Sequence, residues 1–585
     1  MKARALLLAS VLTWVAACSV VRPTAAPSPV PDDALTITVI GTNDVHGAFL
    51  GSDNSGGMTL FAGYVNNLRA QRAAQGGAVL LVDAGDMWQG TLESNLTEGA
   101  SVVAAYNAIG YTAAALGNHE FDFGPVGAAT VPESDDDDPQ GVIKARALEA
   151  QFPMLAANLI DLDTNLPVAW PNVQPSVIVD AAGVKIGIIG VMTENALLTT
   201  ILANTRGLRV APIAQTIQVE AERLRQFGAS VIIVTAHAGS RCTEFDDPYD
   251  LSSCSQQGEI FRVANALEPG TVDVIIGGHA HEGIAHFVNG IAVASAFSRS
   301  SAFDRIDLYV DPSSDSLLGS KIHPPQMLCR YLSIKPGVCA IQEHADVPLA
   351  PAVYAGLTVI PDLALAETIA PALQMAEELK SAELGVHLEE PFRRSDIPET
   401  SVGNLLMDIL LESAADADFA IHNSRGGIRA DLPAGPLNYG KLYEMFPFDN
   451  RRVTIELTGA QLRQVMAKQM TSGRWRAGFS GGKVIATCND DALDVRIVRA
   501  SGEDVQDGDA VRIVTADFLT TGGDAIFSDV IPPGGFPVDH DAPLIRDVLE
   551  TYLLERGGSL SPDMFFDEEN RRFVYESRPP IRCDS

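Results

Sequence analysis

Five short apolar runs in the first half of the chain each end in a cluster of polar residues. The densest cluster is Leu116–Gly124 (LGNHEFDFG), which follows the apolar run Tyr111–Leu116. The other four clusters are TNDVHG (42–47), DAGDMWQG (83–90), AHAG (236–239) and GGHAH (277–281). Buried strands that each deliver a His, Asp or Asn at the carboxyl end bring these side chains to one edge of a sheet. The pattern predicts an α/β fold with one convergent metal site.

Strand-like runs alternate with helical patterns from Leu35 to about Ser300. The helical patterns are Thr59–Gln75, Ala100–Ile109 and Ile213–Phe227. This alternation is typical of an α/β domain, in which the loops that follow the strands carry the chemistry. A chain of 585 residues is too long for a single hydrophobic core, and two or three domains are expected.

The second half of the chain has an α/β pattern of its own. Leu, Ile and Met recur at helical spacing over Pro361–Lys380, after a proline suited to a helix start. A second α/β region follows from about Leu384. We therefore expect a first domain over residues 35–355, a connecting helix over 356–383 and a second domain over 384–585.

The formal net charge of −33 limits the partners that the chain can bind. Long nucleic acids and anionic membrane surfaces need basic protein surface, because binding displaces their counterions. Both are excluded as partners, whereas a small anion held by a metal remains compatible with this charge. The composition, 46% apolar and 20% charged, is that of a folded chain.

Residues 1–17 have the pattern of an export signal. Two basic residues precede the apolar run Ala5–Val15, which is too short to span a membrane. The segment Val15–Cys18 (VAAC) resembles a bacterial lipobox, in which cleavage before the cysteine leaves a lipidated thiol as an anchor. An ordinary cleaved secretory signal is the alternative.

Residues 18–34 are rich in Pro, Ala and Ser and are expected to form a disordered tether. With Cys18 lipidated, the protein would be an exported, periplasmic or cell-surface lipoprotein that contacts the membrane only through its lipid anchor. Ser19 after the anchor favours the outer membrane, if the host has one.

Seven cysteines are an odd number for an exported chain. Lipidation of Cys18 would leave six, and disulfides are common in exported proteins. The plausible pairs are Cys242 with Cys254, Cys329 with Cys339 and, by elimination, Cys488 with Cys583. The alternative is that some of these cysteines remain free thiols.

The polar clusters supply seven candidate metal ligands. They are Asp44, His46, Asp86, Asn118, His237, His279 and His281. A centre of two metals needs one shared carboxylate and enough neutral ligands to keep a net positive charge for a phosphate. Two acids, four imidazoles and one amide favour two divalent transition metal ions (Zn, Mn, Co or Fe) over Ca or Mg, which prefer oxygen ligands.

A single histidine flanked by apolar residues is more often a core residue than a ligand, so each motif alone is weak evidence. Five such motifs in this order, each at a strand end, are much stronger evidence. The six other histidines lack these settings and are expected to have structural or surface roles. They are His286, His323, His344, His387, His422 and His540.

The ordered motifs D-x-H, G-D-x-x-x-G, G-N-H-E, A-H-A-G and G-G-H-x-H are similar to those of the calcineurin-like metallophosphoesterases. The second half resembles the C-terminal domain of the 5′-nucleotidase family, through NSRGGIR (423–429), FPFDN (446–450) and FLTTGGDAIF (518–527). The resemblance covers nearly the whole mature chain. It implies a four-layer α/β/β/α sandwich followed by a distinct α/β substrate-recognition domain.

Carried over residue by residue, the resemblance also implies roles at the site. One metal would be held by Asp44, His46, Asp86 and His281. Asp86 would bridge to a second metal, held also by Asn118, His237 and His279. His119 and Asp122 match the catalytic pair of the family, in which the carboxylate favours the imidazolium that stabilises the leaving oxygen. Glu120 is expected to be structural.

In the second half, the resemblance implies a substrate site. Phe448 and Phe518 would clamp a nucleobase, Asp524 would contact the ribose, Asn423 the base or ribose edge, and Arg429 the phosphate. Two departures limit this carry-over. Asp396 stands about where the family has an arginine, with Arg393 and Arg394 just upstream, and Arg425 is inserted between Asn423 and Arg429.

Together these features predict an extracytoplasmic dinuclear-metal phosphohydrolase that releases phosphate from nucleotides, as a 5′-nucleotidase does, by attack of a metal-activated hydroxide. A 2′,3′-cyclic nucleotide phosphodiesterase with 3′-nucleotidase activity and a UDP-sugar hydrolase share the motifs and remain alternatives. Thiosulfohydrolases use the same scaffold, but paired Phe448 and Phe518 favour a substrate with a base. The non-enzymatic alternative is a nucleotide-binding surface protein. We expect the two domains to close on the substrate about a hinge within Pro361–Leu384.

Overall fold

The computed structural model describes residues 31, 33–51, 56–127, 129–333, 339, 349–395, 399–473, 475–489, 492–533, 535–536, 542–576 and 580–583. The predicted export signal, Cys18 and most of the tether lie outside the described residues. Asp396, His344 and His540 also lie outside them. Within the described part of the chain, no helix is long and apolar enough to cross a membrane.

Two sheets form the centre of the first domain. One contains, in spatial order, β15 (Leu317–Ile322), β14 (Ala302–Val310), β1 (Leu35–Thr42), β2 (Ala78–Asp83), β3 (Ala113–Ala115), β4 (Met154–Leu155) and β6 (Val173–Gln174), with β16 (Gln326–Met327) paired to β14. The other contains β12 (Gly283–Val288), β13 (Ile291–Ala296), β11 (Val274–Gly277), β10 (Val231–His237), β8 (Val184–Met192) and β7 (Ser176–Ala181).

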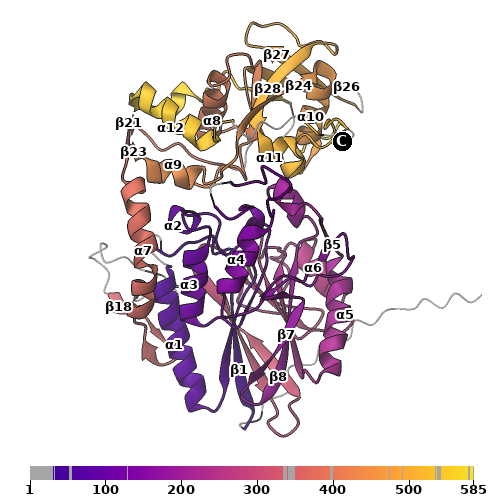
Figure 1. Cartoon of the computed structure of the whole chain (residues 1–585), viewed down its shortest axis with the longest axis vertical. Helices are drawn as coiled ribbons and strands as arrows, with labels where there is room; N and C mark the ends of the chain where they lie inside the picture. Colours follow the sequence, from indigo (N-terminus) through magenta and orange to yellow (C-terminus); the bar gives the residue numbers. More distant parts are fainter. Residues whose placement is uncertain are drawn as a thin grey trace, which may run out of the picture.

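Central strands such as β10 and β11 are buried on both faces, which explains their continuous apolar sequences. In β10, Val231 and Ile233 join a core that also contains Val39 and Leu80 of the first sheet, whereas Ile232 and Val234 pack against a helix. The helices against the first sheet are α1 (Met58–Ala74), α3 (Ala100–Ile109) and α4 (Gly141–Glu149), and those against the second are α5 (Ile213–Gln226) and α6 (Glu259–Ala266). The predicted four layers of helix, sheet, sheet and helix are therefore present, with α1 and α5 on opposite sides in Figure 1.

Helix α7 (Leu363–Lys380) connects the two domains, as the helical spacing predicts. The side chain of Asp362 caps it by accepting a hydrogen bond from the Leu365 backbone N–H. The helix packs along α1 and α3 of the first domain and ends beside α9 (Tyr439–Met445) of the second (Figure 1).

Among its described residues, the second domain contains three small sheets. They are β23 (Gly435–Asn438), β21 (Glu383–Leu388) and β29 (Gly558–Leu560); β24 (Arg452–Thr458), β28 (Ala510–Ala516), β22 (Phe419–Asn423) and β25 (Ala477–Ser480); and β27 (Ala492–Arg499), β26 (Gly482–Asn489) and β30 (Phe573–Tyr575). The larger helices are α8 (Ser401–Glu412), α10 (Gly459–Thr471) and α12 (Ile545–Arg556), and the shorter ones include α11 (Asp517–Thr520) and the 3₁₀ turn η4 (Gly523–Ala525). One continuous apolar core joins these elements.

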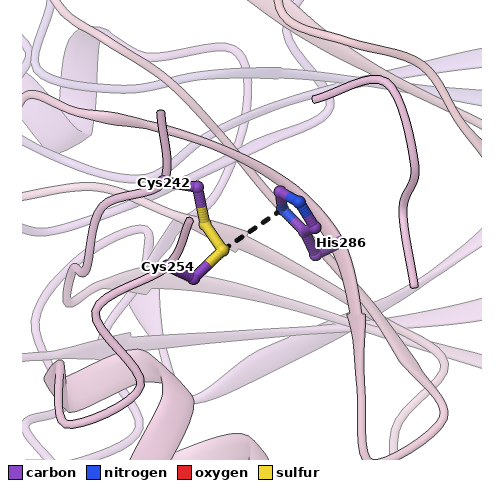
Figure 2. Close-up of side chains that lie close together, drawn as sticks. All are labelled: Cys242, Cys254 and His286. Carbon is purple, nitrogen blue, oxygen red and sulfur yellow. Dashed lines mark hydrogen bonds between the residues drawn. A yellow bond between two sulfur atoms is a disulfide. The ribbon is translucent and has the colours of Figure 1, made fainter. Parts of the chain in front are cut away.

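The three predicted disulfides are all present. They join Cys242 to Cys254, Cys329 to Cys339 and Cys488 to Cys583. The first closes the loop that follows β10, and His286 of β12 lies beside it, with Nδ1 3.7 Å from Cys254 Sγ (Figure 2). His286 is buried, as expected for a structural histidine.

Candidate active site

All seven candidate ligands lie where parallel strands of the two sheets end. Asp44 and His46 follow β1, Asp86 follows β2, Asn118 follows β3, His237 ends β10, and His279 and His281 follow β11. Their ligand atoms form two groups, Asp44 with His46 and His281, and Asp86 with His237 and His279. Within each group these atoms lie within 4.8 Å of one another.

Asp86 belongs to the second group and also faces His46 of the first. Its Oδ2 atom is 3.1 Å from His237 Nε2 and 3.9 Å from His46 Nε2. On one side, His46 Nε2 is 3.0 Å from His281 Nε2, and on the other side, Asn118 Oδ1 is 3.0 Å from His237 Nε2. This is the position of a carboxylate that two metals could share.

The histidine tautomers fit a metal centre. Nδ1 of His46 lies 2.7 Å from the Gln89 carbonyl oxygen, and Nδ1 of His237 lies 2.8 Å from the Ala84 carbonyl oxygen. A carbonyl only accepts hydrogen bonds, so Nδ1 carries the proton and the Nε2 lone pair faces the centre. Such lone pairs, together with carboxylate and amide oxygens, form a donor set that suits transition metals.

The electrostatics of the ligands agree with this geometry. Burial favours a raised pKa for Asp86, but the neighbouring His237 and His119 lower it well below its usual value. Burial opposes the charged form of His237, yet Asp86 and Asp44 raise its pKa to about 10. The negative field that would hold a proton on His237 would equally hold a metal cation.

Five of the seven ligands have positive φ angles, which non-glycine residues adopt rarely. They are Asp44 (50°), His46 (51°), Asp86 (59°), His279 (70°) and His281 (58°). Backbone strain of this kind persists where the surrounding structure holds it, and it concentrates at functional sites.

Glu120 joins two of the ligand loops. Its buried carboxylate accepts hydrogen bonds from the backbone N–H groups of Asp86 (2.9 Å), Met87 (2.7 Å) and Gly117 (2.6 Å). Burial, together with the nearby Asp86 charge, raises its pKa to about 7. These contacts support the expected structural role.

His119 and Asp122 form a hydrogen-bonded pair at the edge of the metal centre. His119 Nδ1 lies 2.5 Å from Asp122 Oδ2, and Thr200 Oγ1 donates to the other carboxylate oxygen at 2.8 Å. Burial lowers the pKa of His119, but Asp122 and Asp86 outweigh that effect and raise it. The His119 ring also lies 6.1 Å from the Phe448 ring of the second domain.

A cleft of about 860 Å³ lies between the domains and contains residues from both predicted sites. From the first domain it is lined by Asp86, Asn118, His119, Asp122, His279 and His281. From the second it is lined by Asn423, Arg429, Phe448, Phe518 and Asp524, all five of the predicted substrate residues. Asp44, His46 and His237 are buried beneath it.

The inserted Arg425 also lines the cleft. Asn423 Oδ1 accepts hydrogen bonds from the backbone N–H groups of Arg425 (3.0 Å) and Gly426 (2.9 Å), so this turn includes the extra residue. Arg394 Nη1 donates to the Ile428 carbonyl oxygen at 3.1 Å, directly beside Arg429.

Three of the remaining histidines are also described in the structure. His323 lies 2.9 Å from Asp307, away from the cleft, and His387 is exposed in β21. His422 is buried and lines the cleft, and burial lowers its pKa to about 4.

Sequence reasoning missed the residues that hold the two domains together. The Gln89 side chain donates to the Pro447 carbonyl oxygen at 3.3 Å, and Asn95 Nδ2 donates to the Tyr443 hydroxyl at 2.7 Å. We use the name bridging loop for residues 89–95, a loop that ends in the short helix α2 (Leu92–Asn95). The backbone carbonyl of Gln89 also orients His46. This one residue therefore contacts both a candidate metal ligand and Pro447, which precedes Phe448. No motif marks these partners except the glutamine's place within G-D-x-x-x-G.

Family models match both halves of the chain. Residues 37–283 match the calcineurin-like phosphoesterase model, and residues 381–529 match the 5′-nucleotidase C-terminal domain model. These ranges contain all the candidate ligands and all the predicted substrate residues.

Proteins related along the whole chain were also found. The chain is 26% identical over 525 residues to protein UshA of Yersinia enterocolitica, covering 84% of this chain and 86% of that protein. It is 26% identical over 582 residues to the 5′-nucleotidase of Vibrio cholerae, covering 93% of this chain and 96% of that protein. The fold is similar to the crystal structure of a 5′-nucleotidase precursor from Thermus thermophilus, with a TM-score of 0.69, 22% identity, and coverage of 93% of this chain and 100% of that chain.

Proposed function

The chain belongs to the phosphoester hydrolases that join a calcineurin-like phosphoesterase domain to a 5′-nucleotidase C-terminal domain, and we propose that it releases phosphate from nucleoside 5′-monophosphates. Membership makes it a metal-dependent phosphoester hydrolase. The observation that carries the finer proposal is the single cleft that holds candidate metal ligands on one wall and Phe448 and Phe518 on the other.

The seven ligands would hold two divalent transition metal ions, Zn, Mn, Co or Fe, with Asp86 shared between them. When bound, such ions supply an activated water and neutralise charge on the phosphoryl oxygens. His119 stabilises the leaving oxygen. Because Nδ1 is engaged by Asp122, the ring nitrogen that can donate to the substrate is Nε2.

The second domain would recognise the rest of the nucleotide. The planar guanidinium of Arg429 suits a phosphate, and its carbon lies 5.8 Å from the centre of the Phe448 ring, so the phosphate and base contacts are adjacent. Aromatic stacking on a base contributes about 1–3 kcal/mol. Phe448 and Phe518 therefore favour a nucleotide over thiosulfate-bearing substrates.

The assay that tests the proposal measures hydrolysis of AMP, 3′-AMP, 2′,3′-cyclic AMP and UDP-glucose, each with Mn, Co or Zn. The products are separated by chromatography, because the first cleavage of 2′,3′-cyclic AMP or UDP-glucose releases no free phosphate. AMP should give the highest kcat/KM. Asp86→Asn, which removes the shared carboxylate charge, should abolish turnover and serves as the control. A higher kcat/KM on 2′,3′-cyclic AMP or UDP-glucose would replace the proposal with one of the two alternatives. Metal-loaded protein without activity on any of the four would contradict it.

We also propose that the protein is exported and anchored by lipid on Cys18, on the basis of the signal and lipobox pattern. Labelled palmitate should be incorporated into the wild-type chain and not into Cys18→Ser. An unlabelled wild-type chain that is released without its first residues would instead indicate an ordinary secretory signal.

A further inference from the structure

Three segments of the second domain, which carry Asn423, Arg476 and Asp524, meet at the strand ends of the sheet that contains β22 and β25. Asn423 ends β22 and pairs in register with Ala477, the first residue of β25, so Arg476 lies next to it. Asp524 lies in η4, which follows β28, the other neighbour of β22. All three side chains line the cleft.

The Asp524 carboxylate is held from two sides. Arg476 Nη1 donates to Oδ1 at 2.7 Å, and Asn423 Nδ2 donates to Oδ2 at 2.5 Å. The two donors therefore fix the plane of the carboxylate as well as its position.

The backbone of Arg476 is anchored independently of this ion pair. Its N–H donates to Gln469 Oε1 at 3.1 Å, and its carbonyl oxygen accepts from the Ser424 N–H at 2.8 Å. The guanidinium thus starts from a fixed point, and its side chain retains only about a quarter of its possible exposure. A side chain placed in this way orients its partner more strictly than a mobile surface arginine does.

An ionised carboxylate has about four acceptor positions, two on each oxygen. Arg476 uses one position on Oδ1, and Asn423 uses one on Oδ2. One position on each oxygen is left, which matches two neighbouring hydroxyl donors such as the cis-diol of a ribose. A 2′-deoxyribose has only one of these hydroxyls and would leave one carboxylate oxygen short of a partner within the cleft.

From this geometry we infer that Arg476 is a positioning residue that orients Asp524 for both ribose hydroxyls, so that the enzyme selects ribonucleotides over 2′-deoxyribonucleotides. The inference rests on the proposed nucleotide-hydrolysing function. A purely structural ion pair would stabilise η4 and would leave the choice between the two sugars unchanged.

The test compares kcat/KM for AMP and dAMP in the metal-loaded full chain. Loss of a hydrogen bond to a charged group corresponds to a preference for AMP of roughly 10- to 100-fold in the wild type. Arg476→Gln should lower that preference by about fivefold or more, chiefly by raising KM for AMP. Arg476→Lys keeps the charge but lacks the planar guanidinium. Its preference for AMP over dAMP should lie between those of the wild type and Arg476→Gln. Arg476→Lys also provides a second variant if the glutamine variant folds poorly.

A double-mutant cycle identifies the path of the effect. If Arg476 acts through Asp524, the AMP to dAMP ratio of Asp524→Ala should not change further when Arg476→Gln is added. Arg496→Gln is the matched control, because Arg496 forms an ion pair of similar length, 2.8 Å, with Asp504 on the exposed surface of the same domain. It should keep the wild-type ratio.

The outcomes distinguish a failure of the role inferred for Arg476 from a failure of the proposed function. Active wild-type enzyme with an unchanged ratio in both Arg476 variants, or with additive effects in the double variant, would overturn the role of Arg476 and leave nucleotide hydrolysis intact. Wild-type enzyme that releases phosphate from neither nucleotide with any of the metals would overturn the proposed function, and this inference with it.

Discussion

Gly117 has no room for a side chain, because it lies against two candidate metal ligands. A Cβ at this position would be 2.3 Å from Asp86 Oδ1 and 2.9 Å from His237 Nδ1. Gly117→Ala should therefore displace both ligands and weaken metal binding by about 10- to 100-fold, the usual effect of disturbing the support of a ligand. Metal titration followed by elemental analysis measures this. Gly319→Ala in β15, where a Cβ meets no atom within 4 Å, is the control, and equal metal content in the two variants would contradict the prediction.

His119 is adjacent to the candidate ligand Asn118, yet its Nδ1 is hydrogen-bonded to Asp122. His119→Ala should lower kcat by roughly 10²- to 10⁴-fold, the range of a proton-transferring side chain, while metal content stays at the wild-type level. Steady-state kinetics and elemental analysis on the same preparation test both parts. Loss of metal in this variant would identify His119 as a ligand instead.

The bridging loop hydrogen-bonds both to the candidate ligand His46 and to Pro447, which precedes Phe448. Tyr443→Phe removes the hydroxyl that accepts from Asn95 and keeps the ring. The loss of one such hydrogen bond should lower kcat/KM for AMP by about 2- to 10-fold. The effect on p-nitrophenyl phosphate should be smaller, because that substrate has no nucleoside for the second domain to hold.

Tyr64→Phe provides the comparison for this element. Tyr64 donates its hydroxyl hydrogen to the Cys329 carbonyl oxygen at 2.8 Å, in the core of the first domain. Tyr64→Phe should leave the ratio of kcat/KM for AMP to that for p-nitrophenyl phosphate unchanged. Equal losses on AMP and p-nitrophenyl phosphate in Tyr443→Phe would show that the contact only stabilises the fold.

At the scale of helices and strands, the sequence predicts those site residues that directly follow or end a buried strand. Asp86 and His237 could be assigned to one centre because each directly follows or ends a buried apolar run, and strands of a parallel sheet end at one edge. The contacts of Gln89 and Asn95 could not be predicted, since they reach a backbone carbonyl and a hydroxyl of the other domain. The proximity of Arg476 to Asn423 could not be predicted either, because it depends on the pairing register of β22 and β25, which no sequence motif indicates.

At the scale of the whole molecule, the candidate metal ligands and the predicted nucleoside contacts belong to different domains that share one cleft. Contacts between the domains include those of the bridging loop with Tyr443 and Pro447 and that of the 3₁₀ turn η2 (Ala196–Leu198) with η4. We propose that the two domains separate for nucleotide entry and release, about a hinge within Pro361–Leu384.

A covalent bridge across the bridging loop tests this motion. In the double variant Asn95→Cys/Tyr443→Cys, a short bismaleimide should join the two domains without touching the three native disulfides. Because product release needs opening, steady-state turnover of AMP should fall at least about tenfold on cross-linking. Each single-cysteine variant treated with the same reagent is the control and should keep its untreated rate. A cross-linked double variant that turns over as fast as the uncross-linked one would mean that nucleotides enter and leave without domain separation, and the hinge would have no catalytic role.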